Sequence, residues 1–144
     1  MSNEFKDKSF DGSIELLRLL VKIVNISDGN EIGVTLNVSG SIVSGLMVGM
    51  KHYYEKIGDM MAENAVDTTK EDDPTDLKRS LKEFFSSLGQ QPDKPDRERQ
   101  FNYIFLRAAK IYSGERIYPE TSSVYWIGKV ESVDGFFLGT LHVP

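Results

Sequence analysis

The chain has 144 residues, about the usual length of one domain and enough to bury a hydrophobic core. It contains no cysteine, so disulfides, iron–sulfur clusters and thiolate metal sites are excluded. The formal net charge of −5 counts against a nucleic-acid partner, because such proteins usually carry a basic face. Seven acids and one base fall within residues 59–76, so the acidity belongs to one central segment.

The first predicted helix has an unusually wide apolar surface. Residues 1–10 are polar and are expected to form a flexible arm without the apolar core of a signal peptide, and the helix follows over residues 11–27. The apolar stretch within it is too short for a transmembrane segment, which needs about 20 residues. The polar side chains of the helix share one narrow stripe, which consists of Glu15, Arg18, Lys22 and Asn25.

One apolar row of this helix can face the core, so a second row must face elsewhere. The second row consists of Leu16, Leu19, Ile23 and Ile26. Two interpretations remain open: helices of the middle segment cover the row, or it is a site for self-association or docking. Full burial of such a side chain contributes about 1.5–3 kcal/mol, so its exposure to water is costly.

Residues 31–50 predict two strands. Apolar and polar residues alternate in the first strand, and Ser39-Gly40 suits a tight turn between the two. Gly45 and Gly49 in the second strand favour sharp bending, as at a barrel corner.

Residues 51–98 predict a helical, acidic insertion that ends in a linker. One helix runs from Lys51 to about Glu63, and Asp73-Pro74 suits the start of another that Gly89 ends. Residues 64–72 are expected to form an acidic loop. The second helix carries an apolar stripe of Leu77, Leu81, Phe84, Phe85 and Leu88. Two prolines follow and indicate a linker at 90–98.

Residues 99–144 predict three further strands. They are expected over 101–112, 124–133 and 136–143, and Asp134-Gly135 between apolar runs is a signal for a hairpin. Consecutive strand residues point to opposite faces, so Phe136 and Phe137 cannot both enter one core. The aromatic residues here either pack into a core on both sides or form an interface. The candidate interface residues are Tyr125, Phe136 and Phe137.

The sequence offers no arrangement of residues that predicts catalysis. His52 and His142 are its two histidines, and neither has metal-ligand neighbours at the usual spacing. Phosphate-binding loops, dinucleotide fingerprints and nucleophile elbows are absent. No spacing of carboxylates nominates an acid–base pair. We therefore expect neither an enzyme nor a cofactor or metal site.

Two stretches resemble one family. The first is residues 36–47 (LNVSGSIVSGLM), and the second joins residues 106–114 (LRAAKIYSG) to 125–130 (YWIGKV) and 133–139 (VDGFFLG). Together with the helix before them, they are similar to gas vesicle protein U, an accessory family encoded with gas vesicle shell proteins. The resemblance implies a non-catalytic cytoplasmic protein, associated with gas vesicles, that supports their assembly, stability or clustering. Its implied partners are shell or accessory proteins.

The order of elements predicts an α+β fold in a single domain over residues 1–144. It resembles a small, strongly bent, five-stranded Sm-like or SH3-like antiparallel barrel with an N-terminal helix and a helical insertion between strands 2 and 3. Such barrels pair their edges between subunits, so we expect a homo-oligomer. The alternative function is an Sm-like nucleic-acid-binding ring, which the net charge of −5 disfavours.

Overall fold

The computed structural model describes residues 12–26, 29–65, 75–90 and 101–141. The expected arm at 1–10, Asp73-Pro74, the linker at 91–98, His142 and most of the acidic loop lie outside these residues. The described elements confirm an α+β fold. In chain order they are α2 (Gly12–Ile26), β1 (Ile32–Val38), β2 (Ser41–Val48), α3 (Met50–Glu63), α4 (Thr75–Leu88), β3 (Tyr103–Ser113), β4 (Arg116–Tyr118), β5 (Val124–Lys129), the 3-10 helix η1 (Val130–Ser132) and β6 (Gly135–Leu138).

The strands form one antiparallel sheet in the order β4-β3-β2-β1-β6. β5 lies off this path and also pairs with β3. One edge of β3 binds β2, and its other edge binds β5 along residues 103–109 and β4 along residues 111–113. At the other end of the path, β6 pairs with β1, with Phe136 opposite Leu36.

The expected five-stranded Sm-like or SH3-like barrel is not confirmed, for two reasons. The sheet has six strands, because residues 116–118 form β4, which is too short to show an alternating pattern. The sheet is also not closed, since β5 pairs with β3 and β6 pairs with β1, but β5 and β6 do not pair with each other. Between them the chain forms η1, and Val130 and Val133 enter the core there. η1 thus separates β5 from β6 in the chain.

The expected hairpin at Asp134-Gly135 is therefore also wrong. Asp134 contacts the β1–β2 turn instead: its backbone N–H donates to the Asn37 carbonyl oxygen over 2.8 Å, and its carboxylate accepts from the Ser39 N–H over 2.9 Å. Ser39 and Gly40 both have positive φ, which suits the two-residue turn expected there. Asp134 thus joins the start of β6 to this turn.

A break in strand pairing occurs near Gly45. The register of β2 and β3 shifts between Ser44 and Leu46. A Cβ atom at Gly45 would lie 3.0 Å from the Ala109 Cα and the Arg107 carbonyl oxygen. Ala108 opposite has a φ of 52°, which is rare for a residue other than glycine. The irregularity expected in the second strand at Gly45 is thus found where the backbones of β2 and β3 approach each other closely.

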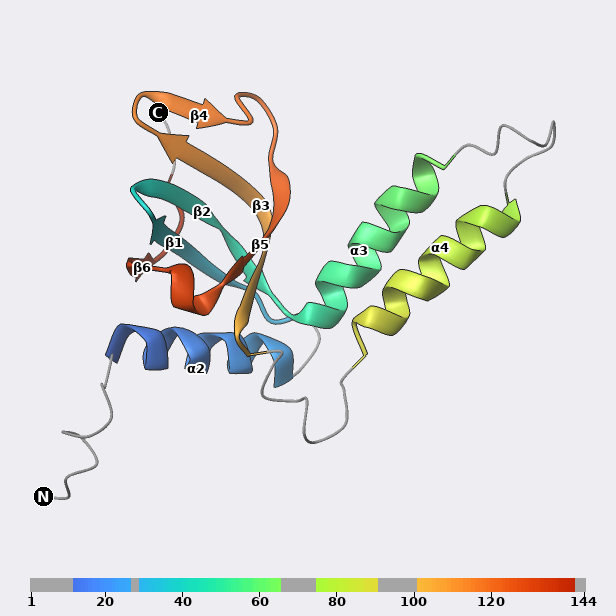
Figure 1. The fold of residues 1–144 in the computed structure, drawn as a ribbon, viewed down its shortest axis with the longest axis horizontal. Coiled ribbons are helices and arrows are strands. Elements are labelled where there is room, and N and C mark those ends of the chain that lie inside the picture. Colours follow the sequence, from blue (N-terminus) through green and yellow to red (C-terminus); the bar gives the residue numbers. More distant parts are fainter. Residues whose placement is uncertain (1–11, 27–28, 66–74, 91–100, 142–144) are drawn as a thin grey trace, which may run out of the picture.

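The helices occupy two separate places around the sheet (Figure 1). α2 lies along one side of the sheet and buries one row of its side chains in the main core. Side chains of β1, β2, β3 and η1 complete this core. α3 and α4 form an antiparallel pair that projects away from the sheet, and α3 meets it through a small cluster of Val48, Tyr53 and Phe105. α4 has no buried residue and packs against α3.

Candidate interaction surfaces

The outer row of α2 is exposed in the structure. Ile14, Leu17, Leu20, Val21 and Val24 pack on or into the core and leave the opposite side of the helix uncovered. The pair α3–α4 lies beside the sheet and does not cover that side (Figure 1). We name the exposed set the outer row: Leu16 is 50% exposed, Leu19 51%, Ile23 38% and Ile26 77%.

The charged residues of α2 flank the outer row on one side. Arg18 approaches Glu15 at 3.4 Å and Glu131 at 3.6 Å, and the Lys22 ammonium lies 5.6 Å from the centre of the Phe101 ring. On its other side the outer row continues without a polar residue into the buried row. Covering the exposed part of these side chains would contribute about 1 kcal/mol each.

The three aromatic candidates near the C-terminus have different surroundings. The Tyr125 ring packs edge-on against the Tyr53 ring, with 5.9 Å between centroids. Phe136 is half-buried and packs against the main core. Phe137 is 51% exposed, and Leu138 beside it is also exposed. The structure thus brings Tyr125 and Phe136 into packing contacts and leaves Phe137 on the surface at β6.

The sequence also indicated the apolar stripe of α4 without showing which part of it packs. Phe85 meets Gly58 of α3, where a Cβ would lie 2.9 Å from the Phe85 Cβ. Three other members of the stripe are exposed, and so are Met60 and Met61 of α3. Four of these exposed residues we name the hairpin face: Met61, Leu77, Phe84 and Leu88.

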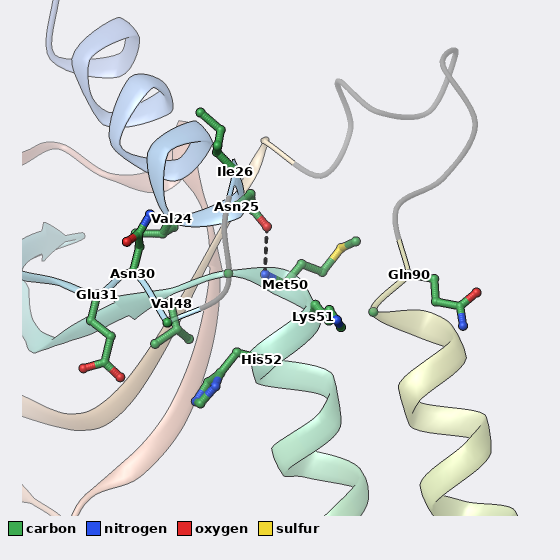
Figure 2. A pocket seen from close by; sticks show the side chains of 13 residues that line it. Val24, Asn25, Ile26, Asn30, Glu31, Val48, Met50, Lys51, His52 and Gln90 are labelled. Atoms are coloured by element: carbon green, nitrogen blue, oxygen red, sulfur yellow. Dashed lines mark hydrogen bonds between the residues drawn. The ribbon is translucent and has the colours of Figure 1, made fainter.

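A pocket of about 410 Å³ lies between the end of α2, the segment before β1, the end of β2, the start of α3 and the residues that follow α4 (Figure 2). Asn25 connects two of its walls: its Nδ2 donates to the Val21 carbonyl oxygen over 2.8 Å, and its Oδ1 accepts from the Met50 N–H over 2.9 Å. A Cβ at Gly49 would lie 2.7 Å from the Val24 carbonyl oxygen. Asn25 and Gly49 thus hold the end of α2 against the start of α3.

Glu31 and His52 are titratable residues that line this pocket. Glu31 accepts hydrogen bonds from Arg107, with Nε–Oε1 at 2.5 Å and Nη2–Oε2 at 2.7 Å. This hydrogen bonding lowers the pKa of Glu31 and raises that of Arg107. The Nε2 atom of His52 is buried and has no hydrogen-bond partner in the described structure. The Glu31 carboxylate that lines this pocket is thus held in an ion pair with Arg107.

A small polar network that the sequence did not reveal holds the segment after β6. Thr35 is buried and donates to the Gly139 carbonyl oxygen over 2.8 Å. The Ser44 hydroxyl lies 3.1 Å from the Thr35 hydroxyl and accepts from the Leu141 N–H over 2.8 Å. In the sequence, the only sign of this network is that Thr35 and Ser44 carry hydroxyl groups within predicted strands. That sign does not show that they bond to Gly139 and Leu141.

Two further observations concern sites of other kinds. Within residues 12–26, 29–65, 75–90 and 101–141, no three His, Asp or Glu side chains are grouped so as to hold a metal ion. None of the helices that the structure describes is long and apolar enough to cross a membrane.

The family comparison matches most of the chain. Residues 14–141 match the family described as gas vesicle protein GvpU-like. No curated protein and no solved structure matches the chain. The matched range includes α2 from Ile14 onward, with its outer row, and the six described strands. The chain belongs to the GvpU-like family of gas vesicle proteins.

Proposed function

We propose that this chain is a non-catalytic accessory protein that supports the assembly, stability or clustering of gas vesicles in the cytoplasm. It does so by associating with itself and by contacting shell or partner proteins. Family membership supports the connection to gas vesicles. The observation that carries the mode of action is the outer row of α2, whose four apolar side chains face solvent.

The outer row suits a contact surface for a physical reason. Scattered single apolar side chains are common on protein surfaces, but a contiguous apolar patch marks an interaction site. Here the four side chains follow one helix at spacings of three and four residues, so they form one continuous stripe. Phe137 and Leu138 on β6 give a second exposed apolar site, on a strand whose outer edge is unpaired within the described sheet.

Flotation of gas vesicles tests this function. Purified vesicles are mixed with the chain, floated and washed, and the bound chain is quantified. We expect the native chain to float with the vesicles. The variant Leu16→Ser/Leu19→Ser/Ile23→Ser should bind at least about tenfold less, since each substitution removes about 1 kcal/mol of binding free energy.

The control changes equally exposed apolar residues away from α2. Tyr118→Ser/Val124→Ser alters β4 and β5 and should bind as the native chain does. Absence of the native chain from washed vesicles and from every complex of vesicle proteins would contradict the proposed function. Equal binding by the α2 variant and the native chain would contradict the role of the outer row.

A further inference from the structure

The hairpin face lies on one side of the α3–α4 pair. α3 contacts α4 at Gly58. A helix advances 100° per residue, so Met61, three residues later, lies about 60° around the helix axis from this contact. On α4, Leu77, Phe84 and Leu88 recur at spacings of seven and four residues, on the side of Phe85 that faces away from Lys82. Because the helices run antiparallel, both sets face the same way, and two helices present one apolar surface.

We propose that the outer row of α2 from one copy docks on the hairpin face of a second copy. The proposal rests on the self-association in the proposed function and names its two surfaces. Both surfaces are apolar, exposed and helical, and their lengths agree: the outer row spans residues 16–26 and the hairpin face spans residues 77–88 of α4, about 15–17 Å each. One helix resting on two is a stable packing arrangement because a row of side chains interdigitates with those of both neighbours.

Charges beside the two surfaces favour this pairing over the pairing of two identical faces. Lys22 flanks the outer row, and Glu83 lies on the flank of α4 that faces away from α3. Asp76 on the same flank is already paired with Arg79 at 2.8 Å. Two hairpin faces packed antiparallel would bring the Glu83 carboxylates of both copies together. Docking of α2 antiparallel to α4 places Lys22 beside Glu83 and Leu16 near Leu88.

The two surfaces lie on different parts of the molecule, so their contact is heterologous. α2 lies along the sheet, and the hairpin projects from it (Figure 1). A copy that uses its α2 still presents a free hairpin face, and a copy that uses its hairpin still presents α2. The contact therefore continues from copy to copy and ends in a ring or an extended chain.

Mixing two variants tests this pairing. Variant one carries Leu16→Ser/Leu19→Ser/Ile23→Ser, and variant two carries Leu77→Ser/Phe84→Ser/Leu88→Ser. Light scattering after size exclusion should show growth with concentration for the native chain, monomers for each variant alone and a 1:1 heterodimer for the mixture. Because every changed residue is partly exposed, both variants should keep the native circular dichroism spectrum.

The alternatives give different patterns. Self-association of variant one would show that hairpin faces pair with each other, and self-association of variant two would show that outer rows do; either result overturns the proposal. A native chain that stays monomeric at all concentrations overturns it as well. Flotation with vesicles is measured separately, so the proposed function can stand while this pairing fails.

Cysteine cross-linking gives a second readout that does not depend on folding of the serine variants. The chain has no cysteine, so introduced ones react without background. Leu16→Cys mixed with Leu88→Cys should form a disulfide-linked dimer at least about fivefold faster than Leu16→Cys mixed with Leu77→Cys, because α2 lies antiparallel to α4. Equal rates, or no cross-linked dimer in either mixture, would overturn the docking.

Discussion

Individual side chains in this protein stabilise contacts between distant parts of the chain. Glu31 precedes β1, and Arg107 lies in β3, yet their side chains form a bidentate ion pair. Asp134 joins the start of β6 to the β1–β2 turn. Thr35 and Ser44 join two strands to the segment after β6. The fold is therefore sensitive to single polar substitutions outside its apolar core.

The ion pair of Glu31 predicts a pH dependence of stability. The Arg107 hydrogen bond lowers the folded-state pKa of Glu31 below its ordinary value of 4.5. A lowered carboxyl pKa stabilises the fold at pH values above the unfolded pKa, and this contribution is lost as the pH falls through the folded pKa. The free energy of unfolding of Glu31→Gln should therefore lie below that of the native chain by up to about 1 kcal/mol at pH 7.

The measurement is urea unfolding at pH 7 and at pH values below 4.5. The difference between native chain and Glu31→Gln should shrink toward zero in acid. Glu55→Gln, at an exposed position of α3, controls for removal of a negative charge. A difference for Glu31→Gln that is the same at all pH values would contradict the assigned role of the ion pair.

At the scale of elements, the junction between α2 and α3 depends on Asn25. Its side chain donates to the Val21 carbonyl oxygen within α2 and accepts from the Met50 N–H at the start of α3. Loss of such a cap typically costs about 0.5–2 kcal/mol. Asn25→Ala should lower the free energy of unfolding by about 1–2 kcal/mol, since a partly buried N–H also loses its acceptor.

Asn64 provides a matched control for this prediction. Its Nδ2 donates to the Met60 carbonyl oxygen over 2.8 Å, the same spacing along the chain as in Asn25, but at an exposed position. Asn64→Ala should cost less than about 0.5 kcal/mol. Equal losses for the two variants in thermal or urea unfolding would show that the contact between the helices is unimportant.

The elements also show how far the sequence could predict the fold. Helical periodicity correctly separated the outer row of α2 from its buried row, because both follow from spacing along one helix. It could not show whether α3 and α4 cover the outer row, since that depends on the direction in which the hairpin leaves the sheet. The Asp134-Gly135 signal failed because hairpin signals are local, whereas the bonds that Asp134 makes reach residues about a hundred positions earlier.

For the candidate surfaces too, the sequence predicted what depends on local geometry but not contacts between distant residues. Phe136 and Phe137 were correctly expected on opposite faces, because strand geometry requires it. Tyr125, a candidate interface residue, packs on Tyr53 of α3, and no local pattern could show this contact because the two residues are far apart in the sequence. The exposed part of the α4 stripe was not identified because only the contact at Gly58 defines which side of α4 packs.

Across the whole molecule, stability should be distributed unevenly. The main core receives side chains from α2, β1, β2, β3 and η1, whereas the hairpin meets the sheet through a smaller cluster around Tyr53. Regions with few buried apolar contacts open locally at lower free energy. Backbone amides of α4, which has no buried residue, should exchange with deuterium at least about tenfold faster than those in the middle of β2.

Hydrogen exchange followed by mass spectrometry checks this at protein concentrations low enough to prevent self-association. Uniform protection of α4 and β2 would show that hairpin and sheet unfold as one unit. Raising the concentration should then slow the exchange of α4 and of α2 together if they dock between copies. Protection that appears in neither helix would argue against that contact.

The place where the hairpin leaves the sheet has a consequence for how such a chain can change. Val48 at the end of β2 and Phe105 near the start of β3 are direct partners in the ladder. The two strands already stand side by side where the helical segment departs, as they would on either side of a short turn. α3 and α4 are thus an insertion between two strands that pair as a β-hairpin does. A change in the length or surface of the two helices therefore need not disturb the pairing of β2 with β3.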